Sequence, residues 1–217
     1  MFFQKILKGI SGLTLGQAAE ILTVTGIESN WIRTKGSASQ QQIAERLTRE
    51  ELQWHLTRYE EIDMRTGESF GKASPFISTT GGTSEQSSIA EEEKAYVFSA
   101  FDRAGWFATV DYTQPGWVFY GYVFTIGKPS VEYVEFAEEV RDLHSYPSGY
   151  SFHHEGELVA KLVIPPSRLE RCEFYRGPEL RRALEAGERP TLKDEDIVWN
   201  RSNYVDPMNY INIRDVL

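Results

Sequence analysis

The chain has 217 residues, of which 41% are hydrophobic and 13% aromatic, a composition typical of a folded globular protein that excludes a largely disordered one. Its formal net charge of −9 argues against a broad basic face for nucleic acid, although a local basic groove stays open. The single cysteine, Cys172, excludes an internal disulfide, so we expect a protein of a reducing, cytoplasmic compartment.

The first 26 residues are moderately apolar, but charged residues and glycines interrupt them. They predict neither a signal peptide nor a membrane span. The spacing of Phe2, Phe3, Ile6, Leu7 and Ile10 instead predicts an amphipathic helix that docks on the core, with attachment to a membrane surface as the less favoured alternative.

Residues 39–63 have a helical rhythm that breaks near Thr48, which predicts one or two helices. The segment 65–75 is rich in Gly, Ser and Pro and predicts a loop, followed by a strand. A further helix is expected over residues 83–100, with the acidic residues 91–93 as its solvated end.

The second half of the chain is predicted to be mostly β-structure. Strand-type runs occur at residues 106–110, 117–126 and 158–164, and helix-like pieces at residues 134–143 and 178–186. The aromatic run within residues 117–124 favours a central strand buried on both faces over a base-stacking surface.

This order of elements favours an α+β fold over an alternating βαβ fold. We expect one domain over residues 1–217, with a helical part over about 1–63 and a β-rich core over about 74–217. The tail from Ile197 onward should pack back as a final strand or cap.

Glu155-Gly156-Glu157 leads directly into an apolar, strand-like stretch. In an extended strand the side chains alternate, so Glu155 and Glu157 should project to one side while Gly156 points away. Two carboxylates on one wall raise each other's proton affinity and can take different catalytic roles. Alone, such a pair is a weak signal, because exposed acidic residues usually serve solubility.

Three motifs together resemble those of ADP-ribosyltransferases of the cholera-toxin and heat-labile-enterotoxin class. They are Trp31-Ile32-Arg33-Thr34, Phe76-Ile77-Ser78-Thr79-Thr80 and Phe152-x-x-Glu155-x-Glu157, the last followed by an apolar run and Ile164-Pro165-Pro166. The resemblance covers roughly residues 28 to 175 and departs from the family pattern at Thr80, where the family usually has Ser. It implies a split β-sandwich with an NAD cleft and flanking helices, in which an early strand contributes Arg33.

The resemblance also implies roles for individual residues. Glu157 would hold the ribose and stabilise the positive charge that develops when the bond to nicotinamide breaks, as carboxylates do in glycoside hydrolysis. Glu155 would engage the acceptor as general base or positioner, and Tyr150 and Phe152 would recognise it. Arg33, with Thr34 beside it, would bind NAD through charge-assisted hydrogen bonds.

In the strand that follows, Ser78 would orient Glu157, and Thr79 and Thr80 would hold the strand and the floor of the NAD pocket. Met64-Arg65 is a competitor for Arg33, but it lies too close before Ser78 to belong to a separate strand. Metal binding by His153-His154 is disfavoured, because adjacent strand residues point to opposite faces and no third ligand set is apparent.

The implied activity is mono-ADP-ribosyl transfer from NAD+, used as a co-substrate without a metal, to a macromolecular acceptor with release of nicotinamide. Glu155 in the first position of the pair favours protein arginine as acceptor. The chain would act as a bacterial toxin or effector, with an antitoxin or immunity protein as a further partner. Three alternatives stay open: modification of an RNA or DNA base in a toxin–antitoxin or phage-defence system, NAD hydrolysis, and a non-catalytic NAD-binding module.

Overall fold

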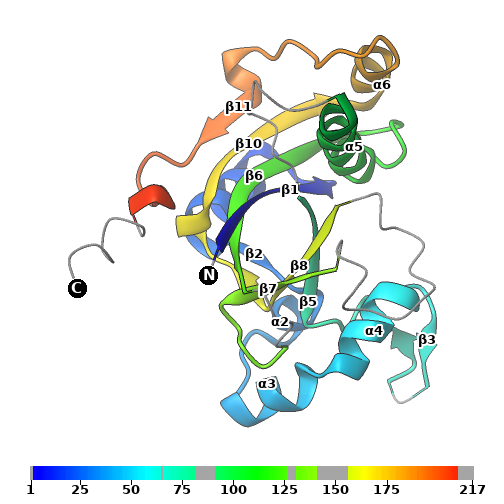
Figure 1. Ribbon diagram of the computed structural model, residues 1–217, viewed down its shortest axis with the longest axis vertical. Helices are drawn as coiled ribbons and strands as arrows, with labels where there is room; N and C mark the ends of the chain where they lie inside the picture. The colour runs from blue at the N-terminus through cyan, green and yellow to red at the C-terminus, as the bar shows by residue number, and fades with distance from the viewer. Residues whose placement is uncertain (1, 65, 82–90, 127–130, 141–155, 210–217) are drawn as a thin grey trace.

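The computed structural model describes residues 2–64, 66–81, 91–126, 131–140 and 156–209. It shows a mixed α+β fold with one large, mostly antiparallel sheet and flanking helices, as the order of elements in the sequence predicts (Figure 1). No helix among these residues combines the length and the apolar character needed to cross a membrane.

The large sheet has seven strands: β1 (Phe2–Ser11), β5 (Phe76–Gly81), β6 (Pro115–Thr125), β7 (Phe136–Glu139), β8 (Glu157–Lys161), β10 (Leu169–Arg176) and β11 (Ile197–Trp199). Two short pairs are β2 (Ile27–Glu28) with β9 (Val163–Ile164), and β3 (Ile62–Asp63) with β4 (Glu68–Ser69). The α-helices are α1 (Leu15–Glu20), α2 (Asn30–Lys35), α3 (Gln40–Arg46), α4 (Arg49–Thr57), α5 (Glu91–Ala108) and α6 (Gly177–Glu185). A π-helical turn, η1 (Ile21–Thr25), continues α1, and 3₁₀ turns precede β10 and β11 as η4 (Pro166–Arg168) and η5 (Asp194–Asp196).

The strand order is β1-β5-β8-β7-β6-β10-β11, and an additional pairing of β1 with β6 closes the first five strands into a ring, which is visible in Figure 1. Two of its junctions are short. Among the described residues, β1 pairs with β5 at Ile6 and Leu7, and β6 pairs with β7 at Phe124 and Thr125, where the two strands run parallel. By contrast, β1 pairs with β6 along its whole length. The sheet therefore divides, at the two short pairings, into a β5-β8-β7 part and a β1-β6-β10-β11 part.

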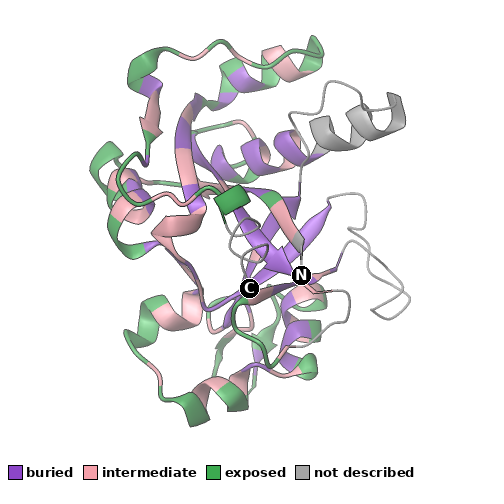
Figure 2. Ribbon diagram, turned by 60° about the vertical axis from the view of Figure 1, so that its left-hand side comes forward, coloured by how far each residue is buried: buried purple, intermediate pink, exposed green. Residues whose placement is uncertain are grey.

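Three apolar clusters surround the ring. One joins Ile6, Ile77 and Leu158 to residues of α1 and η1. A second packs α5 and α6 against β1, β6 and β10. A third packs the α3–α4 region, through Leu47 and Leu52, against β5, β8 and Val140, which follows β7. Figures 1 and 2 show α5 and α6 at one end of the molecule and α3 and α4 at the other, with buried strands between them. The helices therefore cover different parts of the sheet.

Helix α5 comes unusually close to the sheet because glycine stands at two contact points. A Cβ on Gly9 of β1 would lie 2.0 Å from the carbonyl oxygen of Ala104, and one on Gly116 of β6 would lie 1.7 Å from that of Ala108. The helix presents small, buried alanines at these contacts. Gly9, one of the glycines that interrupt the N-terminal segment, thus serves the close packing of a helix on a strand.

Three predicted elements are wrong. The N-terminal segment is strand β1, because its apolar residues divide between two clusters, with Ile6 in one and Leu7 in the other. Residues 106–108 end helix α5 instead of forming a strand. Residues 136–139, expected to be helical, form β7, whose Ala137 and Glu138 are buried. In each case tertiary burial overrides the local pattern.

Other predictions are confirmed. Helices α3 and α4 meet near Thr48, and β5 follows the loop. The aromatic run forms the buried strand β6, residues 158–164 form β8 and β9, and residues 178–185 lie in α6. Cys172 is a buried free thiol in the core, and burial raises its pKa to about 12, which fits a packing role.

Candidate functional site

Glu157 lies in a row of residues that runs across three neighbouring strands. On β8 it pairs with Thr80 of β5, and Thr80 in turn pairs with Leu7 of β1. Leu7 is the last β1 residue that pairs with β5, so the row crosses the place where the two parts of the sheet diverge. Glu157 is only 9% exposed. A carboxylate is thus held, largely buried, beside the split in the sheet.

Ser78 lies on the same face as Glu157. It is two residues before Thr80 on β5, and side chains two residues apart on a strand share a face. Ser78 Oγ lies 2.9 Å from Nε2 of His55, a buried residue of α4. The structure therefore brings the predicted Ser78 and Glu157 to one place, together with a histidine.

A second serine fixes the orientation of His55. Ser74 Oγ lies 2.8 Å from His55 Nδ1 and accepts a hydrogen bond from the Phe76 N–H at 3.1 Å. When the Ser74 hydroxyl donates to Nδ1, the neutral ring carries its own proton on Nε2, toward Ser78. In that tautomer Ser78 accepts from His55, and its own hydroxyl proton is free to be donated to a carboxylate.

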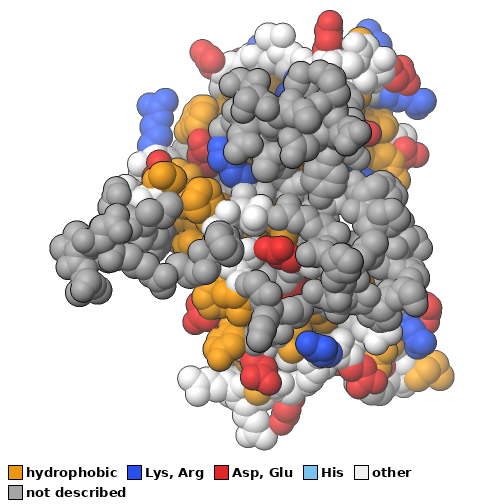
Figure 3. All heavy atoms as spheres, viewed as in Figure 1, with side chains coloured by type: hydrophobic (Ala, Val, Ile, Leu, Met, Phe, Trp, Pro, Cys, Tyr) orange, Lys and Arg blue, Asp and Glu red, His pale blue; other side chains and the backbone are white. Residues whose placement is uncertain are grey.

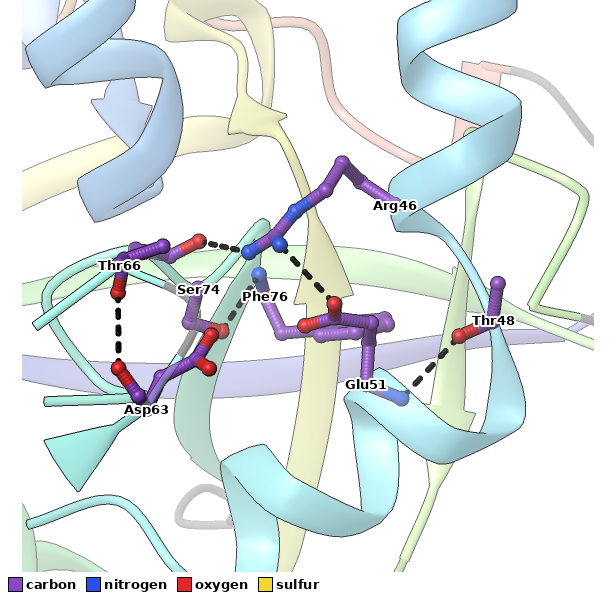
Figure 4. A network of polar contacts seen from close by, with 8 residues as sticks. Arg46, Thr48, Glu51, Asp63, Thr66, Ser74 and Phe76 are labelled. Carbon is purple, nitrogen blue, oxygen red and sulfur yellow. Dashed lines mark hydrogen bonds and ion pairs between the residues drawn. The ribbon is translucent and has the colours of Figure 1, made fainter. Parts of the chain in front are cut away.

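Helix α4 positions His55 through a polar network at its first turn. The Thr48 side chain caps the helix by accepting from the Glu51 N–H, and Glu51 lies one turn before His55 on the buried face. Arg46 reaches from α3 to Glu51 Oε1 at 2.9 Å and to the carbonyl of Ala73, next to Ser74 (Figure 4). Arg46 therefore links the first turn of α4 to the residue that precedes Ser74.

Lys8 of β1 is a cation close enough for its charge to act on this site. It directly follows Leu7, where β1 leaves β5, and its charge acts on both Glu157 and His55. Burial lowers the pKa of Lys8, and the nearby Glu157 carboxylate raises it again. The site thus combines a carboxylate, a hydroxyl, a neutral imidazole and an amine, contributed by β8, β5, α4 and β1.

The protonation of His55 should make stability depend on pH. Burial, helped by the charge of Lys8, lowers its pKa from 6.5 to about 3. Between these pH values the unfolded chain binds more protons than the folded one, so the free energy of unfolding falls as the pH decreases from 6.5. We expect His55→Gln, which has no titrating ring, to show a weaker decrease of the free energy of unfolding over this pH range. Denaturant titrations of both proteins from pH 7 to pH 4 measure the decrease. The same pH dependence in the two proteins would contradict this expectation.

The other predicted residues of β5 make hydrogen bonds within the sheet. Thr79 Oγ1 donates to the carbonyl of Leu158 at 2.6 Å, and Thr80 Oγ1 donates to that of Leu7 at 3.3 Å. Both threonines are buried. Their hydroxyls hold the three strands of the row together.

Arg33 and Thr34 lie on helix α2, so the prediction that Arg33 ends a strand is wrong. Ser29 caps this helix by accepting from the Ile32 N–H, and Gly36 ends it with a φ of 79°. Both predicted side chains are exposed and bond to Asn30, Arg33 to its Oδ1 and Thr34 to its carbonyl. These hydrogen bonds connect them to Asn30 and not to a residue of the row that carries Glu157.

Glu155, Tyr150 and Phe152 lie outside the described residues, as do His153 and His154. Gly156, the first described residue before β8, has a φ of 62° and is therefore not extended. A left-handed glycine changes the direction of the chain just before β8 begins.

Sequence reasoning missed His55 and Lys8. His55 follows Glu51 and Leu52 by four and three residues, the spacing of one helix face, so the helical rhythm of residues 39–63 already placed it on the buried side. Lys8 was missed because the segment around it was predicted to be a helix. Read as a strand, the same segment places a lysine between apolar neighbours next to a glycine.

Charged side chains outside this site are scattered. On the face in Figure 3, the described basic and acidic side chains are interspersed and do not gather in one basic patch. Within the part of the chain that the structure describes, no group of three or more His, Cys, Asp or Glu residues could hold a metal ion.

Comparisons with known proteins give little beyond this geometry. No protein-family model and no curated protein matches the chain. Among solved structures it is similar to one described as EcPltA, with a TM-score of 0.44 and 15% identity over 94% of this chain and 88% of that one. A likeness at this level defines neither a fold family nor an activity.

Proposed function

We propose that the chain is a mono-ADP-ribosyltransferase that moves ADP-ribose from NAD+ to a macromolecular acceptor and releases nicotinamide. The observation that carries the proposal is the row in which Glu157 and Ser78 share one face where the sheet divides, with His55 bonded to Ser78. The charge of Lys8 acts on both Glu157 and His55. The divided sheet supports a split β-sandwich with the NAD cleft at the division.

Glu157 carries the central step. When the bond between nicotinamide and ribose breaks, positive charge builds on the ribose, and a fixed carboxylate stabilises that charge far more in a buried site than in water. Glu157 is fixed in this way by its place in β8 and by its burial. Ser78, oriented by His55, donates its hydroxyl proton to the carboxylate and holds it in place.

Lys8, and not Arg33, is the cation beside Glu157. An amine at this position suits the diphosphate of NAD+, and a bound diphosphate would raise the pKa that burial lowers. Lysine acts as a point charge and lacks the planar fork of arginine, so the diphosphate would be held by charge more than by a bidentate geometry.

The test uses NAD+ labelled in its adenosine half, incubated with cell extract and the purified chain. We expect label to become attached to macromolecules and to be released by protease, as protein arginine would give. Release by nuclease would move the acceptor to a nucleic acid, and nicotinamide release without labelled macromolecules would make the chain an NAD hydrolase. NAD+ that is neither bound nor consumed would overturn the proposal.

A further inference from the structure

Strand β11 is the outer edge of the large sheet. It pairs with β10 on one side, and no other described strand lies on its second side. At the opposite end of the strand order, β1 is covered by its pairing with β6. Figure 1 shows β11 as the outermost strand, beside β10 and beyond the ring. Among the described strands of this sheet, β11 is therefore the one that can take a further strand on its free side.

One hydrogen bond between the neighbouring chains of β10 and β11 decides which backbone groups of β11 face outward. The Asn200 N–H donates to the carbonyl of Glu170 at 2.9 Å, and inward and outward residues alternate along an antiparallel pair. Val198 therefore bonds toward β10, while Ile197 and Trp199 turn their backbone groups away from it. Because the Ile197 N–H donates within the turn η5, the outer edge presents the Ile197 carbonyl with the N–H and carbonyl of Trp199.

These outward groups complement a second copy of the same strand. In an antiparallel pairing centred on Val198, the Trp199 N–H of each copy meets the Ile197 carbonyl of the other, which gives two hydrogen bonds related by a two-fold axis. The same register sets the Trp199 side chain beside Ile197 of the second copy and the two Val198 side chains beside each other. Apolar pairs of this kind across two strands stabilise a pairing.

The Trp199 side chain ends a row that crosses the outer part of the sheet. Arg171 of β10 pairs with Tyr120 on one side and with Trp199 on the other. Its guanidinium lies 4.1 Å from the centre of the Tyr120 ring and 5.2 Å from that of the Trp199 ring. Trp199 is nevertheless 46% exposed. A large ring that is held on one side and exposed on the other suits an interface, because little conformational entropy is lost when a partner packs on it.

The charges that flank β11 favour an antiparallel partner of the same sequence. Residues 194–196, directly before the strand, are all acidic, and Arg201 is the first charged residue after it. Glu195 is 73% exposed, and its ion pair with Lys193, at 3.6 Å, is exposed as well. In the register centred on Val198, Glu195 of one copy lies level with Arg201 of the other. A parallel pairing would instead set like charges side by side.

We propose that β11 pairs with β11 of a second copy of this chain, antiparallel and centred on Val198, so that two large sheets join across a two-fold axis. Only three residues of each copy pair, so the interface is small and the dimer is weak and depends on concentration. In the strand order β10, β6 and β7 separate β11 from β8, so the pairing does not involve the row that carries Glu157. The proposal is independent of the activity proposed above.

Sedimentation equilibrium of the unmodified chain between about 10 μM and 1 mM tests the pairing. We expect the average mass to rise from one copy toward two, and to rise more at low ionic strength, where exposed charges attract more strongly. Trp199→Ala should raise the Kd of the dimer about tenfold, because its contact occurs twice. A mass of one copy at every concentration overturns the proposal and leaves the edge to an extended segment of another protein.

Charge reversal tests the register without changing the strand. Arg201→Glu and Glu195→Arg should each raise the Kd about tenfold, since each replaces two attractive pairs by two repulsive ones. The double variant exchanges the charges and should return the Kd to within about threefold of that of the unmodified chain. Arg181→Glu, the same change at an exposed position of α6, should alter it less than about twofold. A dimer that neither single reversal weakens overturns the proposal.

Hydrogen exchange of single amides reports the pairing in the unmodified chain. The Trp199 N–H faces away from β10, so its exchange should slow as the concentration rises into the range of the dimer. The Val198 N–H bonds toward β10 and should be protected at every concentration. Exchange at Trp199 that stays constant while the mass doubles would place the interface elsewhere and overturn the proposal.

Discussion

Replacing Lys161 by methionine should lower the free energy of unfolding by about 3–5 kcal/mol. Lys161 Nζ lies 2.6 Å from Glu138 Oε1, and the two side chains are 0% and 1% exposed. The amine also donates to the carbonyls of Tyr133 and Phe136 at 2.9 and 2.7 Å. The variant keeps the apolar stem but leaves a buried carboxylate and two carbonyls without this cation.

Denaturant titration measures the loss, which would remove a large share of the total of about 5–15 kcal/mol that is usual for a domain. The double variant Lys161→Met with Glu138→Leu should recover much of it, because a buried pair costs less to remove whole than to break. Lys193→Met serves as the matched control, since its pair with Glu195 is exposed and should contribute less than about 1 kcal/mol. Equal losses at positions 161 and 193 would contradict the expectation.

Glu157→Gln should lower the rate constant for nicotinamide release by about 10²–10³, the cost of removing one well-placed electrostatic group from a transition state. Glutamine has nearly the same shape, so the KM for NAD+ should change much less than kcat. The variant keeps the hydrogen-bonding capacity toward Ser78 but cannot carry the negative charge that the ribose cation needs.

Glu139→Gln is the matched control for Glu157→Gln. Glu139 lies on β7 opposite Leu158, so the change is chemically identical and one strand away. Initial rates of nicotinamide release and the free energy of unfolding are measured for both variants. Similar rates for the two variants, or a loss of folding that accounts for the loss of rate, would remove Glu157 from the reaction.

The sequence predicted the α+β class and the parts of the site that local pattern determines. The strand with Ser78 and the strand that begins at Glu157 were both located, and their antiparallel pairing puts the two side chains on one face. Alternation along a strand is a local property, so these residues could be placed without knowing the rest of the fold.

The rest of the fold and of the site depends on contacts between segments that are far apart in the sequence. Phe2, Phe3, Ile6, Leu7 and Ile10 fit a helix by spacing, and only the close approach of α5 at Gly9 and the pairing with β6 select a strand. Lys8 became a candidate for the site once this segment was seen to be a strand. Arg33 lies instead on a short helix, which begins after Ser29 and ends at Gly36. His55 became part of the site through Ser74, which is 19 residues away in sequence.

The most direct test of the proposed site is a crystal structure of Glu157→Gln with NAD+ bound, since this variant should bind NAD+ and cleave it slowly. We predict the nicotinamide-side ribose within hydrogen-bond distance of the residue 157 side chain, with the diphosphate against Lys8. NAD+ bound elsewhere on the molecule, or no NAD+ bound at saturating concentration, would contradict the account.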